Sequence, residues 1–206
     1  MQAKVQWFAR PPGTKIDMSA IPTYPHRHAV TAQEFLRMAA ADVFATGMRL
    51  ELMEGEIIEM PPIGSAHAAV VNSLAAIMNT VCGKQVIVSV QNPIIVGEQS
   101  VPQPDLALLR MREDEYFHQH PTPADVLLVT EVSDTTLRFD LEKKASLYAA
   151  AGIPETWVID VEQRVLHALR AATPSGYLRK SVIDASGTIT ASAVPRASVA
   201  VNAIFP

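Results

Sequence analysis

Apolar positions spaced at the helical period alternate along the chain with short apolar runs. Residues 65–81 carry apolar side chains close to a 3.6-residue spacing, and Gly83 is placed to end that helix. The segment Thr31-Ala-Gln-Glu34 has the form of a capping box, which predicts a helix over roughly 31–41. A third helix is predicted over 140–151.

Strands are predicted between these helices. Residues 50–60 form two short strands around a turn at Glu54-Gly55, and residues 126–132 are apolar on both faces, as in a central strand. The polar stretch 111–125 is predicted to be a loop or a short helix. Further strands are predicted over 85–91, 93–96, 104–110, 156–160 and 165–170, followed by short β segments within 177–206.

This order of elements predicts one α/β or α+β domain with a mixed sheet. The domain covers residues 31–206, which suits a chain of 206 residues. Residues 1–30 contain four prolines and one glycine, which break any regular pattern. They are predicted to form an N-terminal arm and are a candidate interface with a partner subunit.

Composition narrows the class of protein. The chain is 49% hydrophobic and 18% charged, which excludes a disordered or solvated tail. A single cysteine, Cys82, excludes an internal disulfide and a thiolate-rich zinc site. The apolar runs are short and residues 1–10 lack a signal-peptide core, so we expect a cytoplasmic protein with no membrane span. With a net charge of −4, binding of nucleic acid would need a local positive surface or would involve few contacts.

Two carboxylates lie at strand positions where the surrounding pattern predicts buried, apolar side chains. Alternation along 126–132 places Glu131 on the face of Leu127 and Val129, and Asp105 lies among the apolar residues of 104–110. A buried carboxylate costs several kcal/mol unless a cation pairs with it. For a single carboxylate, a position at a strand end in contact with water is the simpler alternative.

One lysine of the helix 140–151 is also a charged residue at a position that faces the core. Lys144 falls inside the apolar stripe that includes Tyr148, whereas Lys143 falls outside it. Asp140, one turn earlier, is close enough in sequence to pair with Lys144. The lysine either extends past the core to water or reaches a buried acidic partner such as Glu131.

Two strand carboxylates and one inward lysine are the minimum set for a metal-dependent phosphodiesterase. Asp105 and Glu131 would hold Mg²⁺, which prefers oxygen ligands and acidifies a bound water. Lys144 would orient or deprotonate that water, or neutralise developing charge.

The sequence around these residues resembles a known family. The stretch from Asp140 to Asp160 (DLEKKASLYAAAGIPETWVID) is the most specific part, joined by Pro104-Asp105, Thr130-Glu131-Val132 and Glu51-Leu-Met-Glu-Gly-Glu56. Together these resemble the Uma-type family of restriction endonucleases, within the PD-(D/E)XK nuclease superfamily. The resemblance runs from about Thr31 to the C-terminus. It implies a restriction-endonuclease-like mixed sheet flanked by helices, with additional C-terminal strands.

The resemblance also implies roles for individual residues. Asp105 and Glu131 would be metal carboxylates, and the backbone carbonyl of Val132 a further ligand. Lys144 would be the catalytic lysine, and Glu51 a ligand or a neighbour of the ligands. The implied activity is Mg²⁺- or Mn²⁺-dependent hydrolysis of DNA phosphodiester bonds, for which a homodimer would suit the cutting of two strands. One alternative is a catalytically silent module of the same fold that binds nucleic acid or protein. Another is a nuclease that acts on RNA or on structured DNA, which the sequence does not separate from the first because the metal chemistry is the same.

Three positions depart from the family pattern. The superfamily lysine two residues after the acid is replaced by Ser133, which implies that Lys144 on the next helix takes its place. Asp134 stands where proline is more typical, and Leu50 where an aromatic residue is common. None of these changes removes a catalytic group.

Other candidate residues have simpler interpretations. His67 opens the helix 65–81, where packing or capping is favoured over a contact in the active site. Cys82 is expected to be a buried apolar residue, because no base is available to activate it. The pairs His26/His28 and His118/His120 have a spacing that could bind a transition metal on a strand, but they fall in irregular segments and are expected to be exposed.

Overall fold

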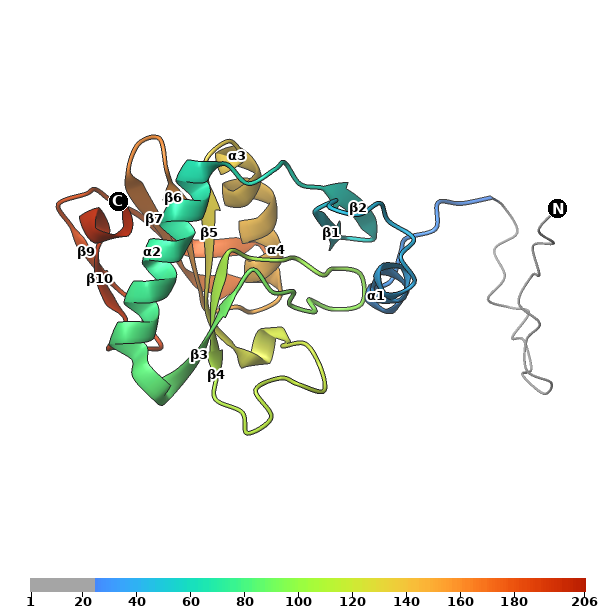
Figure 1. Ribbon diagram of the computed structural model, residues 1–206, viewed down its shortest axis with the longest axis horizontal. Coiled ribbons are helices and arrows are strands. Elements are labelled where there is room, and N and C mark those ends of the chain that lie inside the picture. The colour runs from blue at the N-terminus through green and yellow to red at the C-terminus, as the bar shows by residue number, and fades with distance from the viewer. Residues whose placement is uncertain (1–24) are drawn as a thin grey trace.

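A six-stranded mixed sheet forms the centre of the computed structural model, which describes residues 25–206 (Figure 1). Its strand order is β3-β4-β5-β6-β7-β8, and all neighbours are antiparallel except β5 and β6, which are parallel. The predicted mixed sheet is therefore confirmed. Its strands are β3 (Val86–Val90), β4 (Leu106–Arg110), β5 (Val126–Ser133), β6 (Glu155–Asp160), β7 (Val165–Thr173) and β8 (Gly176–Ile183).

The central strand β5 is buried along its whole length, as its apolar sequence predicts. Its ladder with β4 shifts register between Leu108 and Leu109, which leaves a bulge at Leu127. Leu127 packs in the same cluster as Leu128, whereas Val129 lies in the cluster on the other face. The predicted alternation, which placed Leu127 and Val129 on one face, is wrong at this bulge.

The long helix α2 (Ser65–Cys82) covers one face of the sheet (Figure 1). Its inner residues, including Leu74 and Met78, belong to the largest hydrophobic cluster. The C-terminal strands β9 (Thr188–Thr190) and β10 (Ser198–Ala200) pair with each other and add Ile189 and Val199 to this cluster. These strands confirm the predicted C-terminal β segments. Short 3₁₀ helices lie at Gly83–Gln85, Pro123–Asp125 and Val201–Ile204.

One segment within residues 25–206, Ser65–Gln85, is long and apolar enough to cross a membrane by length and composition alone. It consists of α2 and the 3₁₀ turn that follows. Leu74 and Met78 on its inner side are fully buried in the core, and 28% of its apolar window is buried in all.

The opposite face of the sheet is covered by a helical segment of three parts. The α-helical turn α3 (Leu137–Phe139) leads into a π-helical turn, Asp140–Lys144, and then into α4 (Ala145–Ala150). The predicted helix over 140–151 is therefore confirmed in position, but it begins earlier and its middle is π-helical. Such π turns occur often at functional sites.

A small layer made of α1 (Ala32–Ala40) and the hairpin β1 (Leu50–Met53) and β2 (Glu56–Glu59) packs beside the sheet (Figure 1). The predicted capping box is present, because Thr31 Oγ1 accepts a hydrogen bond from the Glu34 amide while the Glu34 carboxylate accepts one from the Thr31 amide. The predicted hairpin turn is also present.

The segment 92–104 differs from the prediction. Residues 93–96 form no strand; Ile94 N donates to Pro102 O and Val96 N to Ser100 O, so the loop is closed by its own backbone. The predicted arm over residues 1–30 falls mostly outside the described residues.

Candidate active site

Asp105 and Glu131 lie next to each other on one face of the sheet. The β4–β5 register pairs Leu106 with Thr130, and one further step brings Asp105 opposite Glu131. The amide of Val132 donates to Asp105 Oδ2 at 2.9 Å, which ties the two strands together at this point. Asp105 and Glu131 are both buried, at 5% and 2% exposed. The structure thus brings together the two carboxylates that the sequence singles out.

Lys144 reaches the same face from the π-helical turn. Its Nζ lies 2.9 Å from Glu51 Oε1 and 3.3 Å from Glu131 Oε1, and its side chain is 2% exposed. Lys143, by contrast, is exposed. The sequence choice of Lys144 over Lys143 agrees with this placement, and of the two alternatives for Lys144 the buried acidic partner is the one observed.

Glu51 lies on β1 and contacts the cluster, although it is 93 residues away from Lys144 in the sequence. Its Oε1 forms the ion pair with Lys144, and the backbone of Gln103 acts to lower its pKa. Its second oxygen, Oε2, is buried without a hydrogen-bond partner among the described residues. A buried carboxylate oxygen without a partner is costly, so this atom is a position where a cation or a water would be stabilising.

Asp140 does not pair with Lys144 as the helical spacing suggests. Its Oδ2 accepts hydrogen bonds from Ser133 Oγ at 2.7 Å and Thr136 Oγ1 at 2.6 Å. The hydroxyl of Ser133 thus anchors the start of the π turn. The wider turn then presents Lys144 to Glu51.

His67 is the functional candidate that sequence reasoning undervalued. Its Nε2 lies 2.8 Å from Asp105 Oδ1, and Gln91 Nε2 donates to the same oxygen at 3.2 Å. His67 makes no capping bond at the start of α2, so the capping interpretation is wrong, while its role in an active site stays a prediction. Its position at the first turn of α2 was visible in the sequence, but no sequence pattern shows that this turn faces β4.

Tyr148 also contacts the cluster directly. The sequence places it in the apolar stripe of the helix, and it is fully buried. Its hydroxyl donates to Glu131 Oε1, the oxygen that Lys144 also approaches. The spacing of four residues between Lys144 and Tyr148 puts both on one side of the helix, and this spacing was the available signal.

The carboxyl groups of the cluster differ in the direction of their pKa shifts. Burial raises the pKa of Glu131 well above its ordinary value and also raises the pKa of Glu51, while the charge of Lys144 opposes both shifts. Burial acts to raise the pKa of Asp105 as well, but the hydrogen bond and charge of His67 lower it below its usual range. Burial acts to lower the pKa of Lys144, and the charges of Glu131 and Glu51 outweigh this and raise it.

A cavity of about 110 Å³ opens at this cluster. Within residues 25–206, no group of three or more His, Cys, Asp or Glu side chains is arranged to hold a metal ion. The donors that face the cavity are nevertheless suited to a hard cation, because Mg²⁺ is commonly held by one or two carboxylates together with substrate phosphate. The residues that line the cavity include Arg49, Gly64, His67, Gln103, Asp105, Glu131, Val132, Asp134, Asp140 and Lys144.

Other residues considered from the sequence lie outside this cluster. Cys82 is a buried free thiol whose pKa is raised by burial, as expected for an apolar role. His118 and His120 are exposed, and so are His26 and His28.

Comparisons with known proteins agree with this fold. The family model Uma2, described as "Putative restriction endonuclease", matches residues 32–202. A solved structure from Anabaena variabilis ATCC 29413, described as "a putative nuclease belonging to DUF820", superimposes with a TM-score of 0.67 at 16% identity, covering 85% of this chain and 97% of that one. Among curated proteins the comparison found no match. The family model spans most of the chain, and the fold is the expected restriction-endonuclease-like α/β fold. This protein therefore belongs to the Uma2 family of restriction-endonuclease-like proteins.

Proposed function

We propose that this protein is a divalent-metal-dependent endonuclease that hydrolyses DNA phosphodiester bonds. The observation that carries the proposal is the convergence of Asp105, Glu131 and Lys144 on one face of the sheet, at the edge of a cavity. Each comes from a different element, and the family adds independent support for a nuclease.

Asp105, Glu131 and the carbonyl of Val132 are the proposed ligands of Mg²⁺ or Mn²⁺. The Val132 amide points toward Asp105, and in an antiparallel ladder the amide and carbonyl of one residue face the same neighbouring strand. The Val132 carbonyl therefore faces the same side, where Val132 lines the cavity. When bound, the cation would polarise the scissile phosphate and acidify a water molecule.

Lys144 is the proposed donor to the attacking water or to the developing charge on the phosphate. Because Glu131 and Glu51 raise its pKa, Lys144 keeps its proton at neutral pH. Lys144 is therefore suited to donate hydrogen bonds rather than to act as a base. Glu51 holds its ammonium in place through the 2.9 Å ion pair.

Two further properties belong to this proposal. A homodimer would place two such sites for the cutting of two strands. A cytoplasmic setting would give the protein access to DNA. The free thiol of Cys82 is consistent with such a reducing compartment.

A second candidate function is a catalytically silent module that binds nucleic acid or protein. It is favoured by the lack of a three-ligand metal group within residues 25–206. Both oxygens of Asp105 are also occupied by hydrogen bonds from within the chain, which a metal ion would have to displace in part.

Calorimetric titration with Mn²⁺ separates the two functions. Wild type is compared with Asp105→Asn, and Asp184→Asn serves as a control because Asp184 is exposed and remote from the cavity. The nuclease proposal expects saturable binding that is lost only in Asp105→Asn. It also expects Mn²⁺-dependent cleavage of DNA that Lys144→Met abolishes. Equal Mn²⁺ binding by all three proteins and no cleavage would favour the silent module.

A further inference from the structure

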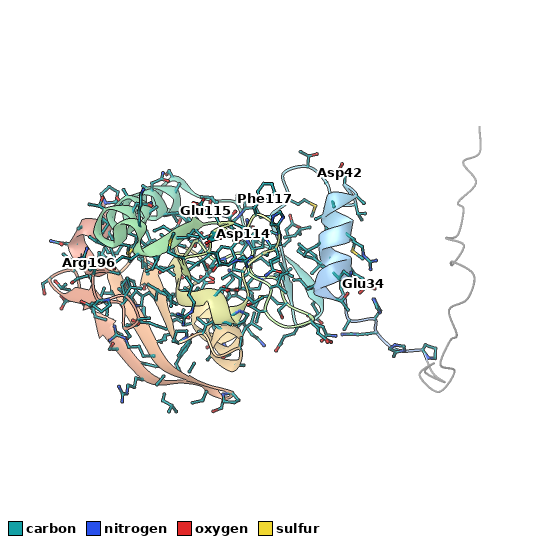
Figure 2. All side chains as sticks on the ribbon, turned by 90° about the horizontal axis from the view of Figure 1, so that it is seen from below. Glu34, Asp42, Asp114, Glu115, Phe117 and Arg196 are labelled. Atoms are coloured by element: carbon teal, nitrogen blue, oxygen red, sulfur yellow. The ribbon has the colours of Figure 1, made fainter. Side chains whose placement is uncertain are left out.

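A second, larger hollow adjoins the active-site cavity. It has a volume of about 990 Å³ and lies between α1, the segment that follows it, and the loop that contains Gln91 and Gln103. Arg49 and Gln103 line both this hollow and the active-site cavity, so the two spaces meet at these side chains. Asp42, which Figure 2 labels just past the end of α1, is also one of the residues that line the hollow.

The walls of the hollow combine apolar surfaces with amide groups. Phe44 and Met48 provide flat or flexible apolar surface, and Met48 is 41% exposed. Gln103 donates to Gln91 O, and Gln91 donates in turn to Asp105. The amides thus connect the hollow to a proposed metal ligand. Apolar walls with a few oriented polar groups are the usual chemistry of a site for a planar organic ligand.

Positive charge is scarce here. Among the described residues that line the hollow, Arg49 is the single basic side chain, and its Nη1 donates to Pro61 O at 2.8 Å. The cavity adds Lys144, which is already paired with Glu51. Proteins that hold the backbone of a duplex do so with several Lys and Arg contacts to phosphates. That source of affinity is small at this site, so stacking and hydrogen bonding must contribute more.

The two spaces also differ in size. The cavity of about 110 Å³ has room for a cation and part of a phosphate, but the hollow lies in the range of about 300–1,000 Å³ that holds whole small molecules. A nucleotide whose phosphate lies at Asp105 and Glu131 would have its base next to Arg49 and Gln103. In a perfect duplex that base is stacked inside the helix and cannot enter.

We propose that the substrate is DNA with an unpaired nucleotide beside the scissile phosphate, and that the base of this nucleotide lies in the hollow against Phe44 and Met48. This inference rests on the proposed nuclease function and specifies the substrate class of the same site. Stacking on apolar and aromatic side chains tolerates any base, so the site selects unpaired structure rather than sequence.

The test compares labelled oligonucleotides of one sequence as a perfect duplex, as a duplex with one unpaired nucleotide and as a single strand. Binding is measured by fluorescence anisotropy in Ca²⁺, and cleavage is measured separately in Mn²⁺. We expect tighter binding of the two DNAs with unpaired nucleotides than of the duplex. Phe44→Ala and Met48→Ala should weaken that binding about 5- to 150-fold, as loss of one stacked base does.

The controls match these variants in residue type. Phe117 is 85% exposed and Met111 is 50% exposed, and neither lines the hollow (Figure 2 labels Phe117). Phe117→Ala and Met111→Ala should bind as wild type does. Phe44 packs against Phe35, so the exposed Met48 keeps the test valid if Phe44→Ala fails to fold.

Two results would overturn the inference: equal or tighter binding of the perfect duplex, or hollow variants that bind unpaired DNA as their controls do. The absence of cleavage on every DNA would instead refute the proposed function. The binding comparison does not depend on cleavage, so the two failures are distinguishable.

Discussion

Replacing Lys144 with methionine tests whether the buried cluster depends on this single positive charge. Lys144 is 2% exposed, and its ammonium pairs with Glu51 at 2.9 Å and with Glu131 at 3.3 Å. Methionine keeps the apolar stem but leaves two buried carboxylates without their counter-ion. Breaking a buried pair in this way costs about 3–5 kcal/mol. Since 1 kcal/mol shifts Tm by about 2–4 °C in a chain of this size, Tm should fall by roughly 6–20 °C.

The loss should depend on pH with a definite sign. Lys144 opposes the effect of burial on the pKa of Glu51 and Glu131, so without it both pKa values rise further above those of the unfolded chain. A carboxyl whose pKa is raised by folding contributes stability while it is protonated, and this contribution is lost as the pH rises through the folded pKa. The difference between wild type and Lys144→Met should therefore be largest at about pH 8 and smaller at about pH 5.

The assay is urea unfolding followed by circular dichroism at both pH values. Lys143→Met is the matched control, because Lys143 is the exposed neighbour of Lys144. The double variant Lys144→Met/Glu51→Gln should recover part of the lost stability, since it removes one of the unpaired carboxylates. If Lys144→Met is as stable as Lys143→Met at the higher pH, the charge does not stabilise the cluster and the reasoning is wrong.

Three further changes test other contacts. Tyr148→Phe removes a hydrogen-bond donor from the buried Glu131 and should reduce the free energy of unfolding by about 1–3 kcal/mol in urea titrations; unchanged stability would argue against that bond. Glu155→Gln breaks the partly buried ion pair with Arg170, and hydrogen exchange should show faster opening of the C-terminal segment than in wild type. Thr31→Ala removes the capping box of α1 and should cost about 1 kcal/mol, with exchange accelerated in α1 alone.

Local patterns predicted much of this fold because local physics determines them. The capping box at Thr31 and the turn at Glu54-Gly55 need only neighbouring residues, and both are present. The apolar stripe of the helix identified Lys144 as inward-facing for the same reason. The strand predicted over 93–96 failed because its backbone bonds within a loop, where Ile94 N donates to Pro102 O, although Ile94 packs in the same cluster as Val129 of β5.

The contacts that complete the site were beyond such patterns. Glu51 and Lys144 are 93 residues apart, and His67 and Asp105 are 38 residues apart. Only the packing of α2 and the β1–β2 hairpin onto the sheet brings them together. The bulge at Leu127 depends on the register with β4, which a single strand's sequence does not encode. The sequence therefore identified candidate residues of the site, but it did not show which of them would contact one another.

The charges of the cluster link the proposed metal and the proposed substrate. Asp105 contacts His67, and Lys144 pairs with Glu51 and Glu131, so the charge of this lysine is already matched by carboxylates. A phosphate entering alone would meet an excess of carboxylates and be repelled. A divalent cation entering alone would bind through Asp105 and Glu131 but leave much of its coordination shell to water. Each therefore supplies what the other lacks, and by thermodynamic linkage each should raise the affinity of the site for the other by the same factor.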